Sequence, residues 1–236
     1  MQYLGGKSRI AKELAKVIRD QVGPDRTFWD PFCGGLSMSL ALGGDGLISD
    51  VSLPLISLYR AVASGWIPPR EVTHTQYVLA RGLEDTDPMK GFCGFGASFG
   101  GKYWGGYARH DPRPGRSSLA HNSQRLLLAN VPELIRRGCV FDHASFFDWT
   151  PWAWSGFIYA DPPYQSTTAY KGTNRLDHVR FWSTCQTWVR MGVPVFVSEY
   201  QCPVPARVIW EKSVPVQVKG GTQAMAGLER LFQVLP

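Results

Sequence analysis

Residues 160–164 read Ala-Asp-Pro-Pro-Tyr and follow a short apolar run. A residue before proline favours extended backbone, and proline fixes its own φ and has no N–H group to donate. The Asp161 carboxylate and the Pro162 carbonyl are therefore fixed hydrogen-bond acceptors, with the ring of Tyr164 beside them. These groups suit a planar ligand that carries an exocyclic amino group. A rigid strand-ending turn is the alternative, and it is less convincing for the whole segment than for Asp-Pro alone.

The segment Asp-Pro-Phe-Cys-Gly-Gly at 30–35 joins a predicted strand to a predicted helix. Glycines at such a turn let a ligand approach the backbone, and a helix N-terminus offers free N–H groups. Asp50 ends the next predicted strand, where an acid commonly binds ribose hydroxyls in nucleotide-binding α/β folds. A tight turn and an unrelated exposed acid are the alternative, because short glycine motifs often match by chance.

Two glycines also precede Lys7, in the segment Tyr-Leu-Gly-Gly-Lys at 3–7. A flexible turn there would bring Tyr3 and Lys7 over a ligand. A surface lysine on a loose N-terminal segment is the alternative.

The elements that must position these residues follow a strand–helix order. Apolar residues at helical spacing predict a helix over 8–21, with Ser8 as its N-cap. Short apolar runs predict strands at 26–32 and 46–50, and a buried strand that stops at the prolines of 162–163. This order favours an α/β fold with a parallel sheet, whose carboxyl edge is where ligands bind.

Composition limits the class of protein. The 236 residues are 44% hydrophobic and 19% charged, as in one sizeable globular domain. The net charge of +6 fits a polyanionic partner without requiring one. The five cysteines include no Cys-x-x-Cys pair, which argues against a disulfide framework or a zinc site. No secretory signal and no membrane-spanning run of ~20 apolar residues is visible. We therefore expect a cytoplasmic protein without a metal site.

Together these segments resemble the Dam-like (D12 class) N6-adenine DNA methyltransferases, which use S-adenosylmethionine. Residues 3–14 resemble the cofactor segment of that family, 30–35 its methionine-side loop and 48–59 its acid-bearing strand and helix. Residues 160–170 resemble its catalytic Asp-Pro-Pro-Tyr with a following Thr-x-x-Tyr. The similar segments occur in family order between residues 3 and 235.

The resemblance implies an α/β fold, a Rossmann-like methyltransferase sheet with helices on both faces and a small inserted DNA-recognition subdomain. Residues 1–64 and 138–236 would form the S-adenosylmethionine-binding catalytic domain. Residues 65–137 would form the inserted target-recognition region. The resemblance also implies that the protein works in the cytoplasm of a bacterial cell or of a phage-infected host.

It also implies roles for residues. Asp161 and Pro162 would accept both N–H groups of a flipped-out adenine, which turns the amine lone pair toward the sulfonium methyl, and Tyr164 would stack on the base. The implied cofactor contacts are Tyr3, Lys7, Gly34, Asp50, Phe146, Asp148 and Asp161. For Phe146, a place in the hydrophobic core is an alternative of equal weight to a cofactor contact.

The stretch 92–116 combines glycines, aromatic residues and arginines without a clean period, which is typical of a functional loop. The residues expected to meet phosphates or guanine edges are Lys102, Arg109, Arg113 and Arg116. Candidate wedges are Tyr103, Trp104 and Tyr107. A loose resemblance to a Dam-type hairpin implies that Trp104 intercalates and Arg109 reads guanine. Gly105 and Gln2 depart from that pattern, which leaves the recognition sequence open, and a solvated basic loop is the alternative.

The predicted partner is double-stranded DNA, and protein partners are not predicted. Two other functions stay open: methylation of cytosine N4 or RNA, and DNA binding by an inactive relative. Asp161 favours adenine over cytosine, and the intact Asp50, Asp161 and Tyr164 argue against inactivity. A role in restriction–modification is also open, although no nuclease motif is visible.

Overall fold

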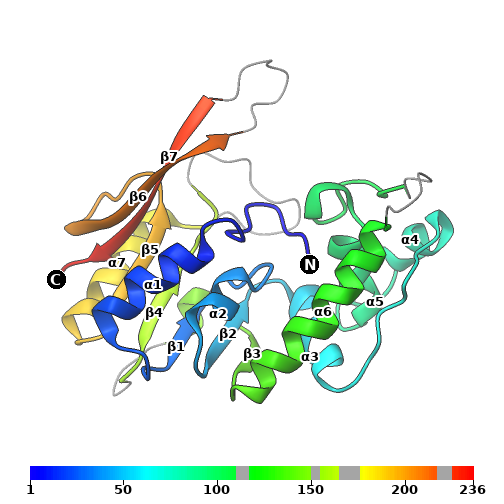
Figure 1. Ribbon diagram of the computed structural model, residues 1–236, viewed down its shortest axis with the longest axis horizontal. Coiled ribbons are helices and arrows are strands. Elements are labelled where there is room, and N and C mark those ends of the chain that lie inside the picture. Colours follow the sequence, from blue (N-terminus) through cyan, green and yellow to red (C-terminus); the bar gives the residue numbers. More distant parts are fainter. Residues whose placement is uncertain (110–116, 150–154, 165–175, 217–224) are drawn as a thin grey trace.

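The computed structural model describes residues 1–109, 117–149, 155–164, 176–216 and 225–236. Its sheet has seven strands in the order β3-β2-β1-β4-β5-β7-β6 (Figure 1). The parallel strands are β1 (Phe28–Asp30), β2 (Gly46–Asp50), β3 (Val140–His143), β4 (Phe157–Ala160) and β5 (Val195–Glu199). The last two, β6 (Ala206–Val216) and β7 (Met225–Val234), form an antiparallel pair, and β7 also runs antiparallel to β5.

The helices flank this sheet. They are α1 (Ala11–Val22), α2 (Ser37–Leu42), α3 (Leu53–Ala63), α4 (His74–Ala80), α5 (Pro88–Gly91), α6 (Leu119–Arg136) and α7 (His178–Arg190). Three short segments are the π-helical η1 (Phe92–Gly96) and the 3-10 turns η2 (Phe99–Gly101) and η3 (Phe146–Asp148). Among the described residues, no helix combines the length and apolar character needed to cross a membrane.

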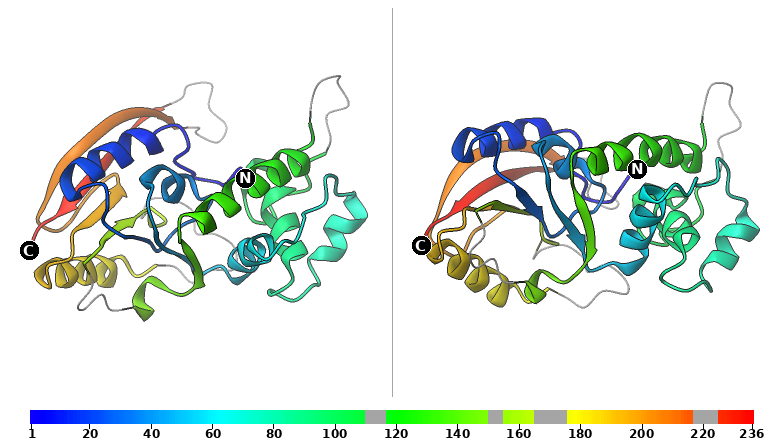
Figure 2. Two further views of the ribbon diagram at one scale, coloured as in Figure 1. Left: turned by 60° about the horizontal axis from the view of Figure 1, so that its bottom comes forward. Right: turned by 90° about the horizontal axis from the view of Figure 1, so that it is seen from below.

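Both faces of the central strands are buried, because their side chains alternate between two cores. Phe28 belongs to the hydrophobic cluster with α1, α2 and α6, whereas the next residue, Trp29, belongs to the cluster with α7. In the same way, Tyr159 belongs to the first cluster and its neighbour Ile158 to the second. Figure 2 shows α1 and α6 on one side of the sheet and α7 on the other. The predicted Rossmann-like α/β fold with helices on both faces is confirmed.

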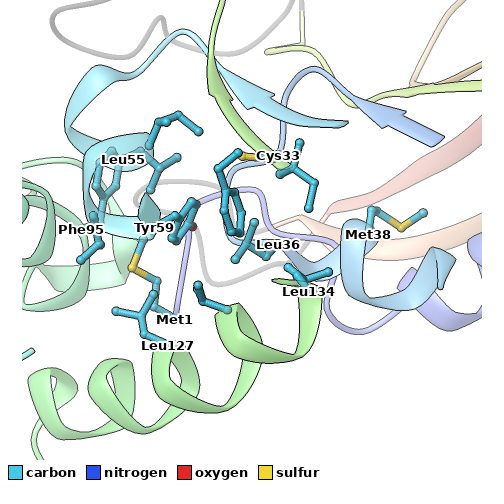
Figure 3. Close-up of a cluster of buried hydrophobic side chains, with 14 of the residues drawn as sticks. Met1, Cys33, Leu36, Met38, Leu55, Tyr59, Phe95, Leu127 and Leu134 are labelled. Carbon is cyan, nitrogen blue, oxygen red and sulfur yellow. The ribbon is translucent and has the colours of Figure 1, made fainter. Parts of the chain in front are cut away.

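The described residues of the segment 65–137 lie beside the sheet, at the end opposite the β6–β7 hairpin (Figure 1). Its apolar side chains continue the core on the α1 face, since Phe95 and Leu127 join the same cluster as Tyr59 and Leu36. Met1 is packed among them (Figure 3). The predicted boundaries at 64 and 138 stay a prediction, but the two regions share one hydrophobic core.

The start of α1 differs from expectation. Ser8 is exposed and does not cap the helix, whose N-cap position is Ile10 without a side-chain cap. Instead the carbonyl of Lys7 accepts hydrogen bonds from the N–H groups of Ile10 and Ala11. The turn that precedes the helix therefore fixes the backbone of Lys7, which matters for the site described next.

Candidate functional site

Three aspartates lie where neighbouring parallel strands end. Asp30 ends β1 and Asp50 ends β2, and Asp161 follows the last residue of β4. Since the order β2-β1-β4 makes these strands neighbours, their carboxyl ends meet at one edge of the sheet. The chain connections reverse direction between β1 and β4, which is the point where open α/β sheets bind ligands.

Asp161 belongs to a buried cluster of four polar side chains, which we call the Lys7 cluster: Lys7, Asp161, Tyr164 and Glu229. The Lys7 Nζ atom lies 2.9 Å from Asp161 Oδ1 and 3.1 Å from Glu229 Oε1. It also donates to the Tyr164 hydroxyl at 2.6 Å, and that hydroxyl donates to Glu229 Oε1. The structure thus brings together Lys7, Asp161 and Tyr164, which the sequence singled out separately, and adds Glu229.

Burial governs the ionisation of this cluster. The pKa of Asp161 is raised to about 6, because burial, helped by the charge of Glu229, outweighs the opposing effect of the Lys7 ammonium. Burial lowers the pKa of Lys7, but Asp161 and Glu229 outweigh it and the net pKa is raised. Lys7 is therefore a cation, and Asp161 is a carboxylate that binds a proton more readily than an exposed aspartate.

The glycine turn and Asp50 form a second part of the site. The backbone N–H of Gly34 donates to Asp50 Oδ2 at 3.2 Å, and the Ser52 N–H donates to Oδ1 at 2.9 Å. Gly34 has φ +41°, and a Cβ on it would lie 2.8 Å from a ring carbon of Tyr3. Tyr3 thus lies over the glycine turn, where the sequence predicted a ligand contact. Burial, opposed by these two N–H groups, raises the pKa of Asp50 to about 6.

No site role was predicted for Asp30 from the sequence, although this residue ends a strand as Asp50 does. Its side chain is buried, Oδ2 accepts the Ser39 hydroxyl at 2.6 Å, and Oδ1 has no hydrogen-bond partner in the described part of the chain. Burial raises its pKa to about 7, and the charges of Asp161 and Asp50 add to the rise.

Glu229 was also missed. It lies two residues before Leu231 on β7, so the two side chains point to the same face of the strand. Both residues are buried. A charged residue at an inward position of an apolar strand is the signal that would have drawn attention to it.

The two predicted residues after β3 lie in η3. Phe146 is 2% exposed and packs against the rings of Trp29, Phe32 and Trp188. Asp148 closes a capping box by accepting the Ser145 N–H at 2.9 Å. These observations favour the core interpretation of Phe146, and a cofactor contact by either residue stays a prediction.

Of the predicted DNA-reading residues, Lys102 and Trp104 lie within an irregular hairpin closed by a bridge between Ser98 and Tyr107, and Arg109 follows it closely. Trp104 has φ 49° and packs edge-on against Tyr77, with the Arg81 guanidinium 5.1 Å from its ring centroid. The ring of Tyr103 stacks on Phe95.

The cationic side chains of the hairpin are more open. Arg109 is exposed and Lys102 is half-buried, while Arg113 and Arg116 lie outside the described residues. The one large apolar side chain of this hairpin that is mostly exposed among the described residues is Phe99, at 72%.

The hairpin is joined to the N-terminal segment. The Leu4 N–H donates to the Gly101 carbonyl at 3.2 Å, and a Cβ on Gly101 would collide with the Gln2 carbonyl at 2.5 Å. Segments far apart in sequence, 2–4 and 99–101, therefore lie side by side, and the first leads directly to Lys7.

Residues 3–79 match the family model of the D12 class N6 adenine-specific DNA methyltransferase. The matched segment contains Tyr3, Lys7, Gly34 and Asp50, and it ends before Asp161. The match confirms the resemblance to this class that the sequence predicted.

Among solved structures, the crystal structure of SMU.472, named as a methyltransferase and complexed with SAH, aligns with 98% of this chain at 12% identity and a TM-score of 0.33. The alignment covers 54% of that protein, so this chain spans about half its length. A similarity this distant carries no argument about the site.

Proposed function

We propose, on the premise that residues 3–79 resemble the D12 class, that this chain transfers a methyl group from S-adenosylmethionine to the N6 amino group of an adenine flipped out of duplex DNA. The observation that supports it most is the convergence of Asp161, Asp50 and Lys7 at the β1–β4 edge of the sheet.

The residues at this edge fit the proposed cofactor. S-adenosylmethionine carries positive charge on its sulfonium and its α-amino group. The buried carboxylates of Asp30 and Asp50 and the half-buried carboxylate of Asp161 line this edge. Asp30 Oδ1 lacks a hydrogen-bond partner among the described residues, as expected of a group that awaits a ligand. Asp50 and the glycine turn would hold the nucleoside and methionine parts, with Tyr3 and Lys7 beside them. When bound, the cofactor supplies an electrophilic methyl group.

Asp161 and Pro162 would act by orientation. The adenine amine is a poor nucleophile because its lone pair is delocalised into the ring. The Asp161 carboxylate and the Pro162 carbonyl would each accept one N–H, which frees the lone pair to point at the methyl group. Such positioning supplies up to roughly 7–11 kcal/mol in the best intramolecular cases. The raised pKa of Asp161 also favours acceptance of the amine proton.

Stacking of the base on Tyr164 requires movement. Its ring is buried, it packs edge-on against Tyr200, and Lys7 Nζ lies 4.6 Å from its centroid. Entry of a base would have to displace at least one of these neighbours, so the stacking role of Tyr164 is proposed for the DNA-bound state alone.

Duplex DNA would meet the 98–109 hairpin. Arg109 and Lys102 supply positive charge for phosphates or base edges. Trp104 stays the wedge implied by resemblance, but most of its contacts are inside the protein. Phe99 is more accessible, and intercalating apolar wedges of this kind are common in proteins that unstack base pairs.

The test is incubation of plasmid DNA with the purified chain and S-[methyl-³H]adenosylmethionine, followed by nucleoside digestion and chromatography. We expect the label in N6-methyladenine. Label in N4-methylcytosine would reject adenine as the substrate. Salt-sensitive DNA binding without any transfer would identify an inactive relative, and an RNA substrate run in parallel separates the remaining alternative.

A further inference from the structure

In the Lys7 cluster, one lysine forms ion pairs with two carboxylates. The Lys7 ammonium pairs with Asp161 at 2.9 Å and with Glu229 at 3.1 Å. The side chains of Lys7 and Glu229 are almost fully buried, and that of Asp161 is 19% exposed. The cluster therefore holds one positive and two negative charges away from water.

The Lys7–Asp161 pair competes with the proposed reaction. The Lys7 ammonium lies 2.9 Å from Asp161 Oδ1 and would compete with an incoming amine for this acceptor oxygen. A buried ammonium that loses its counter-ion is strongly destabilised, so Lys7 could not leave Asp161 without another partner.

Glu229 provides that partner from a different element. It lies on β7, whereas Asp161 follows β4, and the Tyr164 hydroxyl bonds both Lys7 and Glu229. Lys7 can thus move off Asp161 while it keeps a carboxylate and a hydroxyl. We propose that Glu229 is a positioning residue that takes over Lys7 when the amine substrate enters, which releases Asp161 to accept the amine N–H. This inference rests on the proposed function, and it identifies Glu229 as the residue that draws the Lys7 ammonium away from Asp161 in that site.

The titratable groups that are electrostatically coupled to Asp161 come from several elements. They are Lys7 before α1, Asp30 on β1, Tyr159 on β4, Tyr164, Tyr200 after β5 and Glu229 on β7. Of these, Glu229 is a negative charge that raises the pKa of Asp161. Removal of that charge should lower the pKa, and Lys7 would then stay on Asp161.

The experiment compares Glu229→Gln with the wild type in the methylation assay over a pH series. We expect kcat to fall about tenfold, the size of a typical coupling between contacting charged groups. The acidic limb of the kcat profile should move to lower pH. Glu229→Asp keeps the charge and should retain more turnover than Glu229→Gln. Glu211→Gln, on the exposed face of the same hairpin, is the matched control and should behave as wild type.

A purely structural Glu229 would give a different result. Turnover would then fall equally at every pH, in step with a lower unfolding midpoint, and the inference would be overturned. The double variant Lys7→Met/Glu229→Gln adds a second test, because Glu229 is proposed to act through Lys7. It should lose no more turnover than Lys7→Met, and additive losses would refute the exchange. Absence of transfer by the wild type would reject the proposed function itself, whereas an active wild type with an unshifted Glu229→Gln profile rejects the exchange alone.

Discussion

Asp30 offers a sharp test of how the acidic edge is built. Its carboxyl is 1% exposed, with one oxygen bonded by Ser39 and the other unpartnered among the described residues. The substitution Asp30→Asn keeps an acceptor for the Ser39 hydroxyl and removes the buried charge. We expect the variant to be more stable than the wild type at neutral and alkaline pH, and to bind the cofactor more weakly.

The size of the effect follows from the pKa. Burial raises the pKa of Asp30 from its ordinary 3.8 to about 7. The folded state therefore binds more protons than the unfolded state between these values, so this group lowers the free energy of unfolding as pH rises through that window. At about 1.4 kcal/mol per pKa unit, its cost approaches about 4 kcal/mol above pH 7. Between about pH 5 and pH 8 the cost grows by about 2–3 kcal/mol.

The assay is urea unfolding of both proteins without cofactor, at constant ionic strength, over that pH range. The stability of Asp30→Asn relative to wild type should increase with pH by about 2–3 kcal/mol. Asp20→Asn, which changes an exposed carboxylate, is the control and should show no such trend. Calorimetric titration with S-adenosylmethionine should show weaker binding by Asp30→Asn. A stability difference that does not change with pH would refute the reasoning.

Three further predictions concern the site and its surroundings. Asp161→Ala should lower methyl transfer by at least about 100-fold, as loss of a key preorganised group does. Its unfolding midpoint should stay close to wild type, because Lys7 keeps Glu229 as its partner, and normal turnover would contradict the orientation mechanism. Gly34→Ala should cost about 1–3 kcal/mol in thermal unfolding because of its positive φ and the contact with Tyr3, and an unchanged midpoint would contradict the close approach. Phe99→Ala should weaken duplex binding in a fluorescence titration but leave cofactor affinity unchanged, and equal DNA affinity would show that Phe99 does not touch the duplex.

The sequence predicts the sheet edge well because local patterns set it. Asp50 and Asp161 end or follow apolar strand runs, and strands that alternate with helices place such ends together. The position of Lys7 depended on resemblance, since a glycine-rich N-terminal segment has no period that would fix its direction. The structure places its ammonium 2.9 Å from Asp161.

Other features depend on tertiary packing and could not be read from the chain. Glu229 reaches Lys7 because β7 pairs with β5 in a particular antiparallel register, and the β6–β7 ladder itself shifts between Val208 and Trp210. Nothing local distinguishes Phe99 from Trp104, yet Trp104 packs on Tyr77 while Phe99 projects outward.

The shared hydrophobic core of the sheet and the 65–137 region has a consequence for cooperativity. Tyr59 and Leu36 belong to the sheet region and Phe95 and Leu127 to the other, and all four lie in one cluster (Figure 3). Separate melting of the two regions would expose this apolar surface to water, so heating should unfold them in a single transition. Deletion of residues 65–137 would uncover the same surface and favour aggregation over an independently folded sheet region. The 65–137 region is thus needed for the stability of the sheet region, in addition to its proposed role in reading DNA.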